Sequence, residues 1–413
     1  MTVLTEAGTP APVLLPRLVG DAGRQAAGRA RPLRRGVLTA MLDAAVLRGR
    51  GGAGFPVAAK IRAVRKATGV RRPVVVANGV ESEPLSRKDA LLLRSFPHLV
   101  LDGVTLLAHE VGATRAYLAV PERDPLVSDV AGALAERAHG VEVEIVEVPH
   151  TYVASESSAV LNWINGGAAV PTLRPPYEAE RGVGGRPTLV QNVETVAQAA
   201  LVAHYGVDWY RAVGDADEPG TFLLTVDGAV RTSGVYEVAA GTPLADLLER
   251  AGGSVGDDTA VLTGGYQGRW LRGAALRAAS VSRAGMAAAG GTLGAGVVYV
   301  LPRSSCPLAE TARVAGYLAE ESAGQCGPCV HGLAALADAM HVLAWRPDVD
   351  AHAARRILRW AQMVRGRGAC GHPDGAGGFL VSAVAAFADH VEEHVRSGPC
   401  AGARSTPLYR ARP

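Results

Sequence analysis

The chain of 413 residues is longer than one compact hydrophobic core supports, so about two to four domains are expected. A content of 48% hydrophobic and 20% charged residues is typical of a soluble globular protein. The net charge of +3, scattered basic residues and 5% aromatic residues argue against a base-stacking surface, so we expect no nucleic-acid partner. Five cysteines in a chain of this length do not suggest a disulfide framework, which favours a reducing compartment.

Residues 1–35 are rich in Pro, Ala, Gly and Arg and lack a sustained period. We expect an arm there, partly disordered or lying on a partner, and it shows no signal-peptide pattern. Apolar residues recur at helical spacing from Arg35 to Leu47, which predicts a helix. The helix runs into the glycine-rich segment 48–56, and a second helix that carries Lys60 is expected after it.

The segment Pro73–Ala77 reads as a short strand buried on both faces, as in a parallel sheet, and it ends in the polar loop 78–84. Helical and strand patterns then alternate. Helices are expected at 99–111 and 126–138, and strands at 116–120 and 141–148. This alternation predicts an α/β domain whose loops after the strands are available for ligands.

The pattern changes near residue 219. A strand at 221–226, a turn at Asp227-Gly228, a strand at 230–238 and a helix at 243–251 predict a small α+β module. The uncharged run 284–302 is too rich in glycine for a membrane span, so we interpret it as a loop that leads into a strand at 296–301. From 308 to 395 the pattern is helical and is broken at the cysteine motifs.

The spacing Gly49-x-Gly51-x-x-Gly54 formally matches a dinucleotide fingerprint, but a helix precedes it where that motif requires a strand. The glycines still allow close approach of the backbone to a ligand. Their amides could bind a phosphate or the pyrimidine edge of a flavin, with Lys60 in reach of the phosphate. The alternative is a plain tight turn between two helices.

The loop after the first buried strand carries Asn78, Glu81 and Glu83. In open α/β sheets ligands bind at the carboxyl ends of the strands, and carboxylates there suit ribose hydroxyls or a nicotinamide ring. A solvated acidic turn is the alternative.

Five segments stand out along the chain: RGRGGAGFPVAAK (48–60), NGVESEPLSRKD (78–89), FPHLVLDG (96–103), RPPYEAERGVGGRPTLVQNVET (174–195) and ESAGQCGPC (321–329). In order and spacing they resemble the complex I flavoprotein family, whose members are the 51 kDa or F subunits of NADH-quinone oxidoreductase and the diaphorase subunits of NAD-linked hydrogenases and formate dehydrogenases. The resemblance covers about residues 35–400.

The resemblance implies FMN and NADH as cofactors, held by the glycine loop, the acidic loop and matching segments further on. The residues carried over are Gly49, Arg50, Gly51, Gly52, Gly54, Phe55, Lys60, Asn78, Glu81, Glu83, Tyr152, Glu156, Tyr177, Asn192 and Thr195. The chain departs from the family pattern at Val80, Ser155, Ser157 and Gln191, where the family has Asp, Gly, Glu and Asn. These changes remove polar contacts from the implied cofactor site, and each lost hydrogen bond weakens cofactor binding by about 1 kcal/mol.

The family binds one [4Fe–4S] cluster through a Cys-x-x-Cys-x-x-Cys triplet and a distant fourth cysteine. Here Cys326, Cys329 and Cys370 match, whereas Ala323 stands at the first position of the triplet. The resemblance therefore implies a [4Fe–4S] cluster with incomplete cysteine ligation, a [3Fe–4S] cluster or an empty site. His372 is the preferred fourth ligand, ahead of His331.

Other interpretations of the cysteines remain open. Cys306 and Cys400 fall where family members often have cysteines outside the cluster, and we expect them to be structural. A zinc site or a thioredoxin-like motif also fits Cys-x-x-Cys, although no βαβ pattern surrounds it as a thioredoxin motif requires.

The resemblance predicts an α/β flavin- and NADH-binding domain, a β-grasp-like (SLBB-type) α+β module and an all-helical iron–sulfur bundle. The predicted bounds are 1–35 for the arm, 36–215, 216–302 and 303–400 for the domains, and 401–413 for a tail. The implied activity is NADH dehydrogenase or diaphorase chemistry, in which hydride passes from NADH to FMN and single electrons leave through the iron–sulfur site.

The implied partner is a ferredoxin-like or other iron–sulfur subunit, with a membrane-associated reductase complex as a further possibility. We expect a cytoplasmic protein, held at the inner face of the membrane only through partners. A scaffold without FMN and a flavin-free iron–sulfur relay are the alternative functions.

Overall fold

The computed structural model describes residues 17–29, 31, 33–69, 71–172 and 177–404, together with the backbone of residues 3–4 and 10–11. The chain divides into two compact units. Unit 1 comprises Met1–Ser82, Ser86–Leu224 and Gly234–Thr242, and unit 2 comprises Glu83–Leu85, Thr225–Ser233 and Pro243–Pro413.

Unit 1 is built on a four-stranded sheet with the order β5-β4-β3-β6, in which every neighbouring pair is parallel. The strands are β3 (Val74–Asn78), β4 (Arg115–Pro121), β5 (Glu142–Val148) and β6 (Thr188–Asn192). The helices of this unit are α1 (Asp21–Ala26), α2 (Val37–Ala44), α3 (Val57–Ala67), α4 (Lys88–Ser95), α5 (Pro97–Val111), α6 (Leu126–Ala135), α7 (Ser157–Ile164), α8 (Val193–Tyr205) and α9 (Val207–Arg211), with short turns η1 (Tyr152–Ser155) and η2 (Val183–Gly185).

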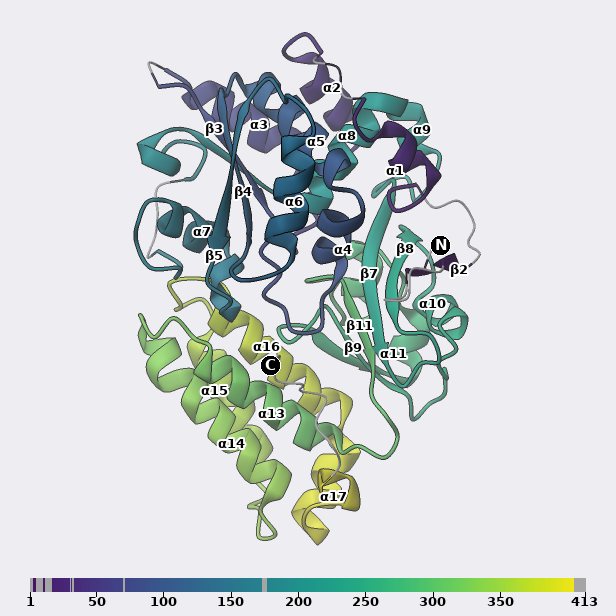
Figure 1. The fold of residues 1–413 in the computed structure, drawn as a ribbon. Helices are drawn as coiled ribbons and strands as arrows, with labels where there is room; N and C mark the ends of the chain where they lie inside the picture. The colour runs from purple at the N-terminus through teal and green to yellow at the C-terminus, as the bar shows by residue number, and fades with distance from the viewer. Residues whose placement is uncertain are drawn as a thin grey trace. The chain divides into compact units, whose positions relative to one another are not determined.

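Alternate residues of β3 face two different hydrophobic cores, because successive side chains of a strand point to opposite faces. Val75 and Ala77 belong to the larger core, which contains buried residues of α3, α5 and α8. Val74 and Val76 belong to the smaller core, with residues of α7. Figure 1 shows helices on both faces of the sheet. This arrangement confirms the predicted parallel α/β organisation and the buried strand near 73–77.

The predicted N-terminal arm is packed in part. Leu18 and Val19 are fully buried, and their backbone N–H groups donate to the buried carboxylate of Glu237 on β8 (Gly234–Ala239) at 2.8–3.1 Å. The guanidinium of Arg17 lies 4.2 Å from the ring centroid of Trp209. Residues 1–2, 5–9, 12–16, 30 and 32 of the predicted arm lie outside the described residues.

Unit 2 contains a sheet region in which β9 (Ala260–Thr263) pairs antiparallel with β10 (Arg269–Arg272) and with β11 (Val297–Val300), and β11 pairs parallel with β7 (Thr221–Gly228) through residues 225–228. Short helices accompany it. They are α10 (Leu244–Arg250), α11 (Gly273–Ala278) and α12 (Arg283–Ala288). The strand expected at 296–301 is confirmed.

The predicted turn at Asp227-Gly228 is wrong by a few residues. β7 continues through Gly228, and β8 begins at Gly234, so the connection is 229–233. Gly228 has a φ of 89° and lies against the carbonyl of Val300, so pairing with β11 keeps these turn-type residues in the strand.

The C-terminal part of unit 2 is helical, as the sequence predicts. Its elements are α13 (Pro307–Glu320), the π-turn η3 (Pro328–Leu333), α14 (Ala334–Trp345), α15 (Ala353–Val364), α16 (His372–Ala386), α17 (Ala388–Ser397) and the turn η4 (Ala401–Arg404). Trp270 of β10 packs against Phe379 and Phe387 and donates its indole N–H to Thr311 Oγ1 at 3.0 Å. Residues 405–413 of the predicted tail lie outside the described residues.

Across the described residues, no single helix has the length and apolar character needed to cross a membrane. Within the described ranges, α4 and α5 reach that length and composition only as a pair, and the two are bent by 95° at the break between them.

Candidate functional site

The glycine-rich segment is an open loop between α2 and α3. Arg48 and Pro56 form an antiparallel bridge, and the N–H of Gly49 donates to the carbonyl of Phe55 at 2.9 Å, which closes the loop at its base. Gly52 and Gly54 have φ values of 101° and 66°, a region that side chains rarely adopt. Residues 51–53 are exposed. The loop therefore presents backbone to solvent, as a ligand cradle requires.

Arg50 anchors this loop from inside the protein. Its backbone N–H donates to Thr195 Oγ1 at 2.8 Å, and its guanidinium, buried with the residue at 4% exposure, lies 3.8 Å from the ring centroid of Phe222. Glu194 and Glu218 lie 4.0 and 3.7 Å from guanidinium nitrogens. The predicted contacts Arg50 and Thr195 thus hold the loop in place, and the Arg50 side chain lies within the protein core.

Two predicted residues of the acidic loop are engaged in local structure. The amide of Asn78 donates to the carbonyl of Ser155 at 2.8 Å and accepts from the N–H of Val80 at 3.1 Å. The carboxylate of Glu81 accepts from the N–H groups of Asp89 and Ala90, at 3.1 and 3.0 Å, at the start of α4. Burial, and then the charge of Asp89, raises the pKa of Glu81.

Glu83 belongs to unit 2, and its carboxylate accepts from the N–H of Tyr266 at 3.0 Å. Gly265, with a φ of 90°, lies beside it, and a Cβ there would come within 2.5 Å of the Glu83 carboxylate. Glu83 is buried, so in this structure its carboxylate is directed at the backbone of unit 2.

A buried ion network behind the glycine loop was not predicted. Lys88 is 3% exposed, and its ammonium lies 2.7 Å from Asp89 Oδ1 and 3.0 Å from Glu194 Oε2. The predicted residue Asn192 donates to Asp89 Oδ2 at 2.6 Å and caps α8. Although burial alone would lower it, the carboxylates of Asp89 and Glu194 raise the pKa of Lys88. The sequence contained one indication of a special role for Lys88, which is one of only three lysines in a chain whose other basic residues of this kind are arginines.

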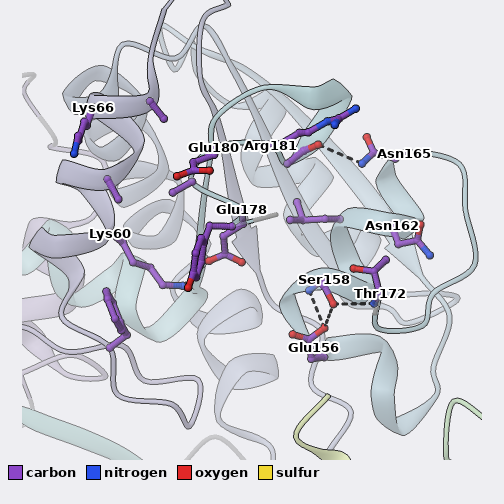
Figure 2. A pocket seen from close by; sticks show the side chains of 17 residues that line it. Lys60, Lys66, Glu156, Ser158, Asn162, Asn165, Thr172, Glu178, Glu180 and Arg181 are labelled. Carbon is purple, nitrogen blue, oxygen red and sulfur yellow. Dashed lines mark hydrogen bonds and ion pairs between the residues drawn. The ribbon is translucent and has the colours of Figure 1, made fainter. Parts of the chain in front are cut away.

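A cavity of about 1300 Å³ opens beside the loop in unit 1 (Figure 2). Four of the predicted cofactor-binding residues line this cavity, namely Phe55, Lys60, Glu156 and Tyr177. Lys60 Nζ lies 2.8 Å from Glu178 Oε1 and 3.3 Å from the carbonyl of Val190. The aromatic rings are available to a ligand, since Phe55 is 52% and Tyr177 81% exposed.

Glu156 on the cavity wall caps α7, because its carboxylate accepts from the N–H groups of Ser158 and Ala159 at 2.8 and 3.2 Å. Tyr152, in the preceding turn, accepts the hydroxyl of Ser82 on its backbone carbonyl at 2.6 Å. Several predicted contacts do not line this cavity. They are Gly49, Arg50, Gly51, Gly52, Gly54, Asn78, Glu81, Glu83, Tyr152, Asn192 and Thr195.

The three cysteines of the predicted cluster lie in the helical part of unit 2. Cys326 and Cys329 flank the start of η3, and Cys370 precedes α16. Although burial opposes it, hydrogen bonds from the backbone of Ala369 and Cys329 lower the pKa of Cys326. Burial, and then the thiols of Cys326 and Cys370, raise the pKa of Cys329 to about 12. The thiol of Cys329 therefore interacts with the thiols of Cys326 and Cys370.

His372 uses both ring nitrogens in hydrogen bonds. Nδ1 lies 2.7 Å from Nε2 of Gln267, and Nε2 lies 2.7 Å from the carbonyl of Leu318. The ring is 5% exposed, and burial lowers its pKa. The structure therefore gives no free nitrogen on His372 for a metal, in contrast to the expectation of a fourth ligand there.

Three regions of the chain match family models. They are the Nuo51 FMN-binding domain at residues 42–201, the SLBB domain at 223–263 and the NADH-ubiquinone oxidoreductase-F iron-sulfur binding region at 309–394. Their order agrees with the predicted order of an α/β flavin domain, a β-grasp-like module and a helical iron–sulfur region.

The chain is 30% identical over 376 residues to the F subunit of NADH-quinone oxidoreductase from Mycobacterium tuberculosis, covering 86% of this chain and 83% of that protein. It is 30% identical over 329 residues to the corresponding protein of Aquifex aeolicus, covering 75% of this chain and 74% of that protein. The crystal structure of an air-oxidised NAD+-reducing [NiFe]-hydrogenase superposes with a TM-score of 0.80 at 30% identity. That match covers 87% of this chain, which spans 62% of the hydrogenase chain's length.

Proposed function

This chain belongs to the family of NADH-quinone oxidoreductase F subunits, and from that premise we propose that FMN and NADH bind beside the glycine loop of unit 1, with Cys326, Cys329 and Cys370 holding the iron–sulfur cluster. The chain is an NADH-oxidising electron-transfer subunit with an FMN-binding domain and an iron–sulfur-binding region. The proposal assigns these cofactors to particular residues.

The loop from Gly49 to Phe55 fits a flavin. Its exposed backbone at 51–53 makes no hydrogen bond within the described part of the chain, so those amides are free to donate to a ligand. A side chain at Gly52 or Gly54 would be strained by the positive φ and would cover the backbone. Arg50 and Thr195 hold this backbone rigidly from behind.

The cavity beside the loop fits the rest of the ligand. Lys60 supplies a cation for a phosphate, and Phe55 and Tyr177 supply exposed rings on which an adenine or nicotinamide can stack. One carboxylate oxygen of Glu156, Oε2, accepts the N–H groups at the start of α7, so this side chain shapes the wall of the cavity. The residues of the chain bind and orient the ligands and are not required as acid, base or nucleophile.

The chemistry that FMN supplies when bound is acceptance of a hydride from NADH and release of single electrons. Three thiols fit a cluster with three cysteine ligands, either [3Fe–4S] or [4Fe–4S] with one iron ligated by a group other than cysteine. His372 is left out of this ligand set because both of its nitrogens are hydrogen-bonded.

Electrons that leave the cluster require a second redox protein, so the proposed partner is a ferredoxin-like or other iron–sulfur subunit. The match to the hydrogenase and the similarity to NADH-quinone oxidoreductase support operation within a multi-subunit assembly. We place this assembly in the cytoplasm, attached to a membrane only through a partner.

The observation that carries this proposal is the exposed glycine backbone next to a cavity that contains Lys60 and two exposed rings. The visible spectrum of the anaerobically purified chain tests it. Flavin bands together with iron–sulfur absorbance are expected. Iron–sulfur absorbance that persists without flavin after incubation with FMN would support a relay function, and a colourless protein that takes up neither cofactor would support a scaffold.

A further inference from the structure

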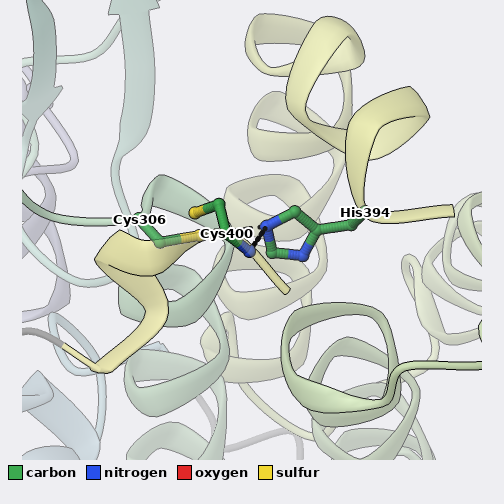
Figure 3. A group of neighbouring side chains, drawn as sticks. All are labelled: Cys306, His394 and Cys400. Atoms are coloured by element: carbon green, nitrogen blue, oxygen red, sulfur yellow. Dashed lines mark hydrogen bonds between the residues drawn. The ribbon is translucent and has the colours of Figure 1, made fainter. Parts of the chain in front are cut away.

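A second cluster of cysteine and histidine lies in unit 2, separate from Cys326, Cys329 and Cys370. Cys306 precedes α13, His394 lies in α17, and Cys400 precedes η4 (Figure 3). Their ligand atoms all lie within 4.8 Å of one another. Cys306 and Cys400 fall outside residues 309–394, which match the iron–sulfur binding region. We propose that these three residues bind a zinc ion.

The distances suit tetrahedral zinc. With about 2.3 Å for a zinc–sulfur bond and about 2.0 Å for a zinc–nitrogen bond, a sulfur and a nitrogen ligand of a tetrahedral zinc ion lie about 3.5 Å apart. Cys306 Sγ lies 3.5 Å from His394 Nε2. Cys306 is 1% exposed and His394 0%, so these two ligands are already sheltered from water, and Cys400 is half-buried. Two thiolates with one imidazole are a donor set that favours zinc over harder cations.

The histidine is oriented for this role by its other nitrogen. His394 Nδ1 lies 3.2 Å from the carbonyl of Leu343, to which it can only donate. That bond places the proton on Nδ1 and leaves the lone pair of Nε2 directed at the two cysteines. In the structure this lone pair accepts the backbone N–H of Cys400 at 3.3 Å. Zinc would replace this weak contact.

The turn that carries Cys400 is held in place without metal. The N–H of Cys306 donates to the carbonyl of Gly402 at 3.2 Å, and the carbonyl of Ala403 accepts from Arg313 and Trp345. Gly402 is required by this close approach, because a Cβ there would meet the nitrogen of Cys306 at 2.8 Å. The site is therefore pre-organised, and zinc would fix the segment after α17 to the start of α13.

Binding forms two zinc–sulfur bonds and one zinc–nitrogen bond and releases the two thiol protons. The described residues supply three ligands, which is the number that accompanies a fourth position filled by water or another small donor in many zinc sites.

Metal analysis of the full-length chain, purified anaerobically without chelator, tests the proposal. About one zinc per chain is expected, and it should be lost in Cys400→Ser and in His394→Gln. The matched control is Cys370→Ser, which should change iron and leave zinc unaltered. Circular dichroism checks that each variant is folded.

A measurement on the unaltered chain keeps the test decisive if the variants fail to fold. Dialysis against a chelator and then Co²⁺ should produce thiolate-to-cobalt absorption that Zn²⁺ abolishes. A chain that contains no zinc and shows no such absorption would overturn the proposal. Zinc that persists in both folded variants, or a Cys306–Cys400 disulfide found by mass spectrometry in the anaerobic protein, would overturn it as well.

Discussion

Nζ of Lys60 lies 2.8 Å from Oε1 of Glu178, and both side chains line the cavity of unit 1. The two side chains are 27% and 25% exposed, so the pair is partly screened by water. Glu178 therefore occupies the position on Lys60 that a phosphate oxygen would take, and an anionic ligand has to displace the carboxylate before it can use the ammonium group.

Glu178→Gln should tighten FMN binding. The change removes a competing charge that is worth at most about 1 kcal/mol at this exposure, which corresponds to about fivefold in Kd. Quenching of flavin fluorescence on titration with the protein measures it. Glu180→Gln is the matched control, because Glu180 lines the same cavity, and it should change Kd much less. Equal effects of the two substitutions, or weaker binding in Glu178→Gln, would contradict the role assigned to the ion pair.

Lys88→Met should strongly destabilise the protein. The substitution leaves the buried carboxylate of Asp89 without its cation and leaves Glu194 only the guanidinium of Arg50 at 4.0 Å, a loss that typically costs about 3–5 kcal/mol. Urea unfolding monitored by circular dichroism provides the measurement. Lys66→Met, at an exposed position of α3, is expected to stay within about 0.5 kcal/mol of the unaltered chain. A similar small loss for both variants would show that the network contributes little.

Glu237 should make the stability of the chain depend on pH. Burial raises its pKa, although hydrogen bonds from Thr221 and from the N–H groups of residues 17–19 act in the opposite direction. Because folding raises this pKa, the protonated carboxyl of Glu237 stabilises the folded state most at a pH below the pKa of an unfolded glutamate. That contribution is lost as the pH rises through the folded pKa.

Glu237→Gln removes the titratable carboxyl. It also weakens the hydrogen bonds that this side chain accepts, but the resulting loss of stability does not change with pH. The difference in free energy of unfolding between the variant and the unaltered chain should therefore shift in favour of the variant as the pH rises above the pKa of an unfolded glutamate, about 4.3, toward neutral and alkaline pH. Urea midpoints across this range measure the difference. A constant difference would mean that Glu237 has the same pKa in both states.

The sequence predicted the features that depend on local pattern. The buried strand at 73–77, the open glycine loop and the helical region after residue 308 follow from runs of apolar residues, from glycine spacing and from helical periodicity. Alternation along β3 between two cores was implied by the run of apolar residues from Val74 to Ala77. Each of these patterns is contained in a short stretch of sequence, so it can be recognised without knowing the tertiary contacts.

Features set by distant contacts could not be predicted. Whether Arg50 faces a ligand or the core depends on Glu194 and Phe222, which are remote in the chain. The bonding of His372 depends likewise on Gln267 and Leu318, and the end of β7 depends on its pairing with β11. The period of apolar residues in a segment does not show which distant residues will contact it in the folded chain.

Ala323→Cys should complete the ligand set of the cluster. If Cys326, Cys329 and Cys370 hold three corners, a fourth thiolate at the family position should raise iron toward about four per chain and change the paramagnetic resonance spectrum. Ser322→Cys, one residue away, is the matched control and should leave both unchanged. Iron that is the same in the Ala323→Cys variant and in the parent chain would argue against this geometry.

The most direct test of the central claim is anaerobic titration of the FMN-loaded chain with NADH, followed at the flavin absorption band. The proposed site predicts bleaching that is complete near one NADH per bound flavin and is weakened in Lys60→Met through loss of bound FMN. A flavin that stays bound and oxidised in the presence of excess NADH would contradict the assignment of hydride transfer to this cavity.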